Sequence, residues 1–249
     1  MERREDAWNS KILGRDMKIC IYGNGGMPIL AFPTRYGSPY EWDQEGVIDL
    51  LSPWIEGKKI TVFTVDSVDH ETWFNYQGDI EWRANRQEAY YEYIIDEVFT
   101  YIQQHGFAGI LPLCMGADSG GLSAMIMFLR RPELFSGVLS MSATYDAKIH
   151  YDGWLNSFLY DNSPVDFLPN MSDTHPYIDL YNSKKIAVCS GQSFDEQHEL
   201  ASAKELVNIL HWKRICVWAD FWGEDSGHNW YWWKLQIGHF LPWLLGERE

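Results

Sequence analysis

The fold is decided by the stretch LCMGADSGGLSA, which runs from Leu113 to Ala124. An apolar run over 107–113 leads into it, and the segment 120–130 that follows has helix length and ends near Pro132. Small residues on both sides of Asp118 permit a sharp turn between the two segments, and such a turn exposes the side chain at its tip. The stretch therefore predicts a strand, a tight turn carrying Asp118, and a helix.

Apolar runs of strand length recur along the chain, with helix-length segments between most of them. Strands joined through helices form right-handed crossovers, so the pattern predicts an α/β fold whose mostly parallel sheet is covered by helices on both faces. The first two runs are joined by Gly23-Asn24-Gly25-Gly26, which favours a hairpin. We expect strands at 17–22, 27–32, 60–65, 107–113, 137–141, 186–189 and 215–219, and helices at 91–102, 120–130, 199–211 and 232–245.

Length and composition favour one domain over residues 1–249. The chain has 249 residues, of which 46% are hydrophobic, and can bury one large core. Residues 143–185 form a long departure between two predicted strands and are rich in Tyr, Asp, Asn and Pro. Connections of that length are usually functional. We therefore expect this segment to act as a lid or a pocket wall.

The charge and the cysteines exclude several functions. A formal net charge of -15 repels phosphate backbones and anionic lipid, which argues against nucleic acid and membranes as partners and leaves a small-molecule substrate. A charged N-terminus and the lack of a run of roughly 18 apolar residues predict a cytoplasmic protein. Cysteine and histidine spacings indicate no zinc site, and we expect no metal and no cofactor. The oligomeric state stays open, a homo-oligomer included. The cysteines, expected to be small buried hydrophobic residues without disulfides, are Cys20, Cys114, Cys189 and Cys216.

Three loops that follow predicted strands gather residues with catalytic chemistry. In an open parallel sheet, ligands bind beyond the carboxyl ends of the strands. The loops are 116–120 with Asp118, 190–196 with Asp195 and Glu196, and 220–230 with His228. The chain order is nucleophile, acid and histidine, whereas trypsin-like proteases run histidine, acid and serine. The Asp-Ser-Gly-Gly at 118–121, which matches such proteases, is therefore a coincidence.

With these loops in place, the sequence resembles the compact esterases of the esterase D and antigen 85 type, within the α/β-hydrolase superfamily. The resemblance covers nearly the whole chain and implies an α/β-hydrolase fold and esterase-like hydrolysis of a small carboxylic ester or acyl group. The matching segments are FPTRYGSPYEW (32–42), VDSVDHETWFNYQG (65–78), RRPELFSGVLSMSATYD (130–146), NSPVDFLPN (162–170) and DFWGEDSGHNWYWWK (220–234).

The resemblance also implies roles for single residues. His228 matches the catalytic histidine of these esterases, and Asp195 or else Glu196 falls where they carry the acid. Asp220 and Asp225 are less favoured acids. The loop with Thr34 and Arg35 is expected to supply one oxyanion-hole amide, and Ser119 the other. Arg35 could neutralise Asp118 or bind an anionic group of the substrate. Pocket walls are expected from Trp42, Trp73 and Trp154, whereas nothing supports a role for His150 or His198.

The departure from these esterases lies at the nucleophile. They carry serine twelve residues before an Arg-Arg-Pro, and here that position is Asp118. A carboxylate that attacks an ester forms an acid anhydride, so aspartate is a poor replacement for serine. Three alternatives stay open: Asp118 attacks saturated carbon, as in dehalogenases and epoxide hydrolases; Ser119 is a shifted nucleophile, although it points about 100 degrees away around the helix; or the site binds a ligand without reaction.

Overall fold

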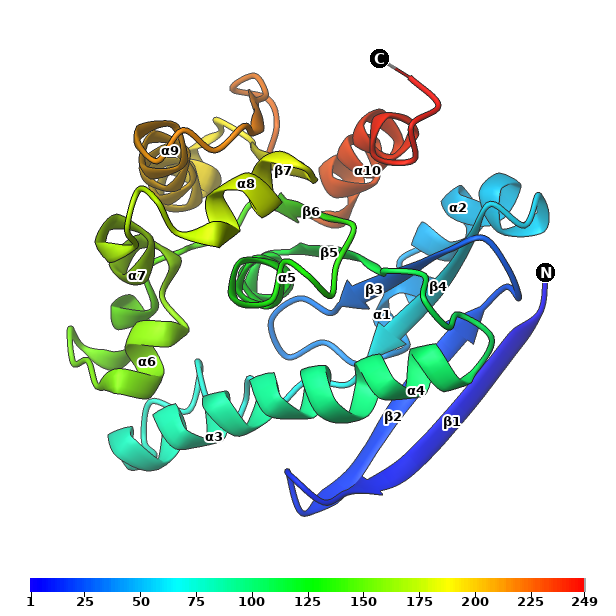
Figure 1. Ribbon diagram of the computed structural model, residues 1–249, viewed down its shortest axis with the longest axis horizontal. Coiled ribbons are helices and arrows are strands. Elements are labelled where there is room, and N and C mark those ends of the chain that lie inside the picture. Colours follow the sequence, from blue (N-terminus) through cyan, green and yellow to red (C-terminus); the bar gives the residue numbers. More distant parts are fainter. Residues whose placement is uncertain (249) are drawn as a thin grey trace.

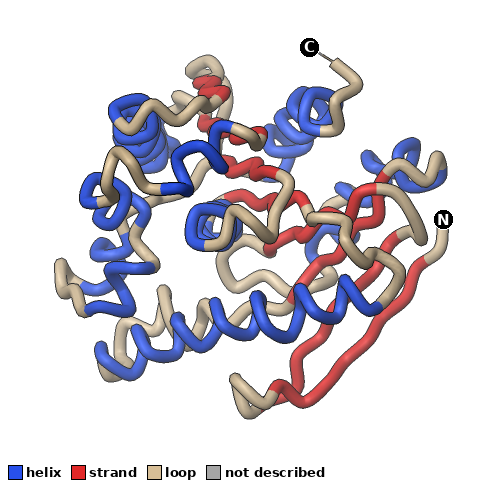
Figure 2. The backbone as a smooth tube through the Cα atoms, in the orientation of Figure 1, coloured by secondary structure: helices blue, strands red, loops and turns tan. Residues whose placement is uncertain are grey.

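The computed structural model describes residues 1–248, and it contains one eight-stranded sheet flanked by helices (Figures 1 and 2). The strand order is β1-β2-β4-β3-β5-β6-β7-β8, with β1 and β2 antiparallel to their neighbours and the strands from β4 to β8 parallel. The predicted α/β class with a mostly parallel sheet is confirmed. The strands are β1 (Arg3–Ser10), β2 (Arg15–Tyr22), β3 (Met27–Phe32), β4 (Ile60–Val65), β5 (Leu113–Ala117), β6 (Gly137–Met141), β7 (Lys185–Ser190) and β8 (Trp218–Phe221).

Helices cover both faces of the sheet, and each face has its own apolar cluster (Figure 1). One face packs against α1 (Glu41–Gln44), α2 (Val47–Glu56) and α10 (Trp230–Leu244). The other face carries the longer helices and the segment 143–185. These elements are α3 (Ile80–Glu92), a π-helical segment (Tyr93–Val98), α4 (Phe99–Gln104), α5 (Ser119–Arg130), a 3-10 turn (Ala147–Tyr151), α6 (Ser157–Asp161), α7 (Pro164–Asn170), α8 (Pro176–Asn182), a second 3-10 turn (Phe194–Glu196) and α9 (Gln197–Trp212).

The predicted hairpin between β2 and β3 is wrong, because β4 lies between these two strands. β2 instead pairs with β1, a strand that the sequence did not suggest because seven of its eight residues are exposed or only partly buried. The glycines of the turn allow the chain to pass close to β4. A Cβ atom on Gly26 would lie 2.1 Å from the carbonyl of Lys59. The turn therefore carries the chain past the start of β4 and does not join two adjacent strands.

Other predictions need smaller corrections. The strand expected at 107–113 begins only at Leu113, because Pro112 has no N–H for the ladder and Gly109 has a positive φ of 76°. The last strand begins at Trp218 and not at 215. Cys216 is exposed, unlike the other three cysteines, which are buried as expected. Within residues 1–248, no helix is both long and apolar enough to cross a membrane.

Candidate active site

Asp118 occupies a strained turn between β5 and α5. Its backbone has φ 54° and ψ -129°, a conformation that residues other than glycine rarely adopt. Backbone hydrogen bonds hold the turn: the Asp118 N–H donates to the carbonyl of Met141 at 3.0 Å, and the Asp118 carbonyl accepts from Gly121 and Leu122. The carboxylate is therefore presented by rigid structure at the carboxyl end of the sheet.

Two glycines make this turn sterically feasible. A Cβ atom on Gly116 would lie 2.2 Å from the carbonyl oxygen of Gly120, and one on Gly120 would lie 2.4 Å from the carbonyl oxygen of Pro33. Side chains at these positions would push α5 away from β5 and from the end of β3. The Gly-x-Asp-x-Gly pattern is thus a packing requirement of the strand-turn-helix unit.

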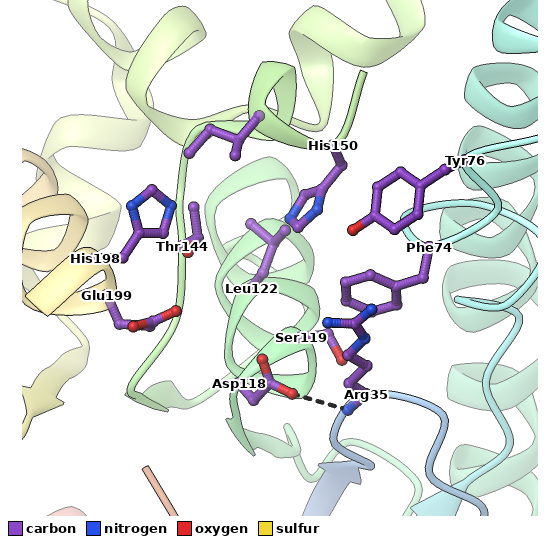
Figure 3. Close-up of a pocket in the computed structure, with 11 residues that line it drawn as sticks. Arg35, Phe74, Tyr76, Asp118, Ser119, Leu122, Thr144, His150, His198 and Glu199 are labelled. Carbon is purple, nitrogen blue, oxygen red and sulfur yellow. Dashed lines mark hydrogen bonds between the residues drawn. The ribbon is translucent and has the colours of Figure 1, made fainter. Parts of the chain in front are cut away.

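In the loop after β3, three consecutive backbone N–H groups donate hydrogen bonds to three different carboxylates. The Thr34 N–H and hydroxyl both donate to Glu41, and the Tyr36 N–H donates to Asp69 at 2.8 Å. Between them, the Arg35 N–H donates to Asp118 Oδ2 at 3.0 Å (Figure 3). This loop contains two predicted oxyanion-hole residues. The backbone N–H of Arg35 faces the site, whereas that of Thr34 is bonded to Glu41. The Asp118 carboxylate itself accepts the Arg35 N–H bond.

His228 lies between two carboxylates. Its Nε2 is 3.7 Å from Asp118 Oδ1, and its Nδ1 is 3.4 Å from Glu196 Oε1. The Asp118 contact is long for a hydrogen bond, as catalytic contacts often are before a substrate closes the site. The ring also packs edge to face against Trp233, with centroids 5.0 Å apart. The loop after β8 thus brings His228 to the elbow.

Glu196, and not Asp195, faces the imidazole ring. Glu196 is fully buried, and its two oxygens accept hydrogen bonds from Ser142 at 2.7 Å and from Ser190 at 3.0 Å. Asp195 is exposed and accepts the backbone N–H of His228 at 3.3 Å. The preferred position of the acid thus moves by one residue, because the 3-10 turn at 194–196 directs Glu196 inward. The less favoured Asp220 instead contacts Trp222 and His239.

The two carboxylates set the protonation of the histidine. Burial alone lowers the pKa of His228, but its interactions with the nearby carboxylates of Asp118 and Glu196 outweigh burial and raise the pKa to about 10. An imidazole between two opposite charges favours its charged form. The ring is therefore an imidazolium at neutral pH, whereas the base of a serine triad must be a neutral imidazole.

Ser119 occupies the first position of α5 and lines the cavity in front of Asp118. Its backbone N–H has no carbonyl partner within the helix, as holds for the first residues of any helix. This leaves the amide suited to an oxyanion. Among the hydrogen bonds of residues 1–248, none joins the Ser119 hydroxyl to His228. The geometry thus directs the imidazole to Asp118.

A cavity of about 210 Å³ opens beside Asp118 (Figure 3). Three of its polar residues, His150, His198 and Glu199, are not predicted by the sequence, because they lie outside the matching motifs. Burial lowers the pKa of His150 to about 4, so this ring is neutral at pH 7. The cavity is lined by Arg35, Phe74, Tyr76, Asp118, Ser119, Leu122, Thr144, Ile149, His150, His198 and Glu199.

The tryptophans expected in the walls are absent from this lining. Trp42 and Trp73 are almost fully buried in the core, and Trp154 stacks on Tyr151. The segment 143–185 does contribute to the wall through Thr144, Ile149 and His150. These three tryptophans thus pack against other side chains and do not line the cavity.

Glu196, Glu199 and His228 form a group whose ligand atoms lie within 4.8 Å of one another. Their spacing could accommodate a metal ion. However, both oxygens of Glu196 already accept serine hydrogen bonds, and His228 faces Asp118. The set coincides with the acid and histidine of the site, so the expectation that no metal takes part stays a prediction.

The model of the family described as "Putative esterase" matches residues 10–244. The chain belongs to this family. Membership in the esterase family supports esterase-like hydrolysis and does not favour the alternatives of a binding-only protein or attack on saturated carbon.

The α/β-hydrolase fold of this chain is also found in several solved structures. A ferulic acid esterase superposes with a TM-score of 0.78 at 17% identity, covering 98% of both chains. An S-formylglutathione hydrolase from Agrobacterium tumefaciens gives 0.77 at 13% identity, covering 98% of this chain and 94% of that one. MPT51 from Mycobacterium tuberculosis gives 0.71 at 14% identity, covering 97% and 98%. Comparison with curated protein sequences finds no match. At these identities, the structures establish the fold of this esterase-family chain.

Proposed function

We propose that this protein hydrolyses small carboxylic esters with good leaving groups, and that Asp118 is the nucleophile. The observation that carries the proposal is the position of His228 between Asp118 and Glu196, which keeps the ring protonated beside the attacking carboxylate. A carboxylate needs no base to remove a proton before it attacks. What its reaction needs is an acid for the leaving group, and the imidazolium is that acid.

In the first step, an oxygen of Asp118 bonds to the acyl carbon of the ester. The carbonyl oxygen displaces Asp118 Oδ2 from the Arg35 N–H and takes its hydrogen bond, with the Ser119 N–H as second donor. The bond to the leaving group then breaks, and its oxygen receives the proton of His228 Nε2. The products are an alcohol or phenol, a neutral imidazole and a mixed anhydride between the acyl group and Asp118.

In the second step, His228 acts as a base. Anhydride formation removes the charge of Asp118, so the pKa of His228 loses one of the two carboxylate interactions that raise it. The neutral ring accepts a proton from water while the water oxygen attacks the acyl carbon. The bond to Asp118 breaks, its carboxylate leaves with the electron pair, and the carboxylic acid product and the imidazolium are formed.

This chemistry limits the substrates. A carboxylate leaves a tetrahedral intermediate far more readily than an alkoxide does, so esters of simple alcohols return to starting material. Phenolic esters and thioesters, whose leaving groups are more stable as anions, partition forward. The site is therefore expected to prefer activated esters.

Hydrolysis of 4-nitrophenyl acetate and ethyl acetate by the wild type, Asp118→Ala and Ser119→Ala tests the proposal. We expect the wild type to hydrolyse the nitrophenyl ester, Asp118→Ala to lose roughly 100-fold or more of kcat/KM, and Ser119→Ala to retain most of it. The ethyl ester should react far more slowly. Equal activity in wild type and Asp118→Ala, with circular dichroism showing both folded, contradicts the proposal. Loss of activity only in Ser119→Ala identifies Ser119 as the nucleophile instead.

A further inference from the structure

The side chain and the backbone N–H of Arg35 make different contacts. The N–H of this residue faces Asp118, but its guanidinium lies over the Phe74 ring, 4.2 Å from the centroid, and 5.0 Å from that of Tyr36 (Figure 3). One guanidinium nitrogen donates to the Tyr36 hydroxyl at 3.4 Å. Aromatic rings, and not the Asp118 carboxylate, therefore hold the cation in place.

This guanidinium has no acidic partner. Within residues 1–248, no carboxylate lies within 4.0 Å of the Arg35 guanidinium nitrogens, although the chain carries 35 acidic and 20 basic residues. Arg35 is also the one Lys or Arg among the residues that line the cavity. A guanidinium stacked on a ring keeps its in-plane N–H edge available, and that edge matches a carboxylate with two parallel hydrogen bonds.

The cavity has two chemically different ends (Figure 3). His198 and Glu199 lie across it from Arg35 and Phe74. Ligand atoms of Glu199 and His228 lie within 4.8 Å of each other, so His228, the proposed proton donor to the leaving group, lies toward the Glu199 end. The acyl chain of a substrate attacked by Asp118 then extends toward Arg35.

We propose that Arg35 binds a carboxylate at the far end of the acyl group, so that the preferred substrates are half-esters of short dicarboxylic acids. The assignment of the acyl group to this end rests on the proposed function. Phe74 and Tyr76 contact the apolar part of the chain, and the guanidinium pairs with its terminal charge. Asp118 and Glu199 repel an anion placed elsewhere in the cavity, so the charge selects one orientation.

A matched pair of substrates tests the proposal: mono-(4-nitrophenyl) adipate, which is an anion, and 4-nitrophenyl hexanoate, which has the same chain length without charge. Mono-(4-nitrophenyl) glutarate and pimelate vary the length. We expect the wild type to prefer the best half-ester, and Arg35→Gln to reduce the ratio of the two kcat/KM values by about 10- to 100-fold. Arg35→Lys should give an intermediate ratio. Arg4→Gln, which removes the same charge on the remote strand β1, should keep the wild-type ratio.

Binding separates failure of this proposal from failure of the proposed function. Adipic acid monoanilide and hexanoic anilide repeat the same pair as amides, and calorimetry measures their affinity without any reaction at Asp118. Tighter binding of the anion by wild type but not by Arg35→Gln supports the carboxylate site even where ester hydrolysis is absent. Equal affinity for both anilides in the wild type, or a half-ester preference that Arg35→Gln leaves within twofold, overturns the proposal.

Discussion

The buried carboxylate of Glu196 lies 3.4 Å from Nδ1 of His228. Ser142 donates a hydrogen bond to one oxygen of this carboxylate and Ser190 donates to the other, so the carboxylate cannot turn away from the ring. Trp233, on α10, donates to Ser142 at 2.9 Å and so connects the last helix to the acid. The imidazole is thus oriented by a chain of contacts that starts in the core.

Glu196→Gln is expected to lower kcat/KM for an activated ester by roughly 100-fold or more, because the amide neither stabilises the imidazolium nor fixes its orientation. Asp195→Asn removes the neighbouring carboxylate and should cost less than about tenfold, since Asp195 accepts hydrogen bonds from the His228 backbone N–H and the Ser193 hydroxyl and not from the imidazole ring. Steady-state kinetics on both variants measure this. A larger loss in the Asp195 variant would show that the acid is Asp195.

His228 predicts a specific pH dependence of stability. Its pKa in the folded protein is raised from 6.5 to about 10, so the stabilisation from its charge is fully present below pH 6.5 and is lost as the pH rises toward 10. The free energy of unfolding in urea should therefore fall between pH 6.5 and 10 more steeply in the wild type than in His228→Gln. Parallel curves for the two proteins would contradict the raised pKa.

Asp118→Ser removes one of the two carboxylates beside His228, so the pKa of that ring should move down toward its usual value. The serine variant then contains a neutral base and a hydroxyl nucleophile, and we expect it to hydrolyse ethyl esters better than the wild type does. Its kcat/KM should rise with pH through the lowered pKa. The pH profile of the variant measures this, and a profile that rises only near pH 10 would argue against the assigned charge interaction.

Gly120→Ala tests the packing of the elbow. The added methyl group would lie 2.4 Å from the Pro33 carbonyl, so we expect a loss of about 1–3 kcal/mol in the free energy of unfolding. Gly238→Ala is the matched control, because Gly238 lies inside α10 with nothing within 4 Å of its added Cβ, and alanine there should stabilise by about 0.5–1 kcal/mol. Denaturant unfolding of both variants measures the difference. Equal effects would mean that the elbow tolerates a side chain.

Sequence patterns predicted the parts of the fold that local chemistry determines. The buried runs at β4 and β6 have the predicted bounds, and the turn at Asp118 lies where its small neighbours placed it. The pairing of strands that are distant in the sequence was harder to predict. Nothing local in Met17 to Phe32 reveals that β4 inserts between β2 and β3, and the charged run of β1 resembles a surface segment until β2 pairs with it.

For the site too, local sequence predicted some features, and others depend on how the chain folds. Chain order and strand ends predicted that Asp118 and His228 would meet. The choice between Asp195 and Glu196 depends on the phase of one 3-10 turn, which adjacent acidic residues do not reveal. His150 reaches the cavity through the fold of the segment 143–185, and no motif marks it.

Chemical trapping of the Asp118 anhydride tests the central claim most directly. Hydroxylamine, added while the enzyme turns over 4-nitrophenyl acetate, cleaves an anhydride at either carbonyl carbon. Attack at the acyl carbon forms acetohydroxamate and frees Asp118, whereas attack at the Asp118 carbonyl carbon converts the aspartate into a hydroxamate that peptide mass spectrometry locates. We predict modification at Asp118 that forms only when substrate is present. An active enzyme whose acyl adduct is on Ser119 would contradict the account.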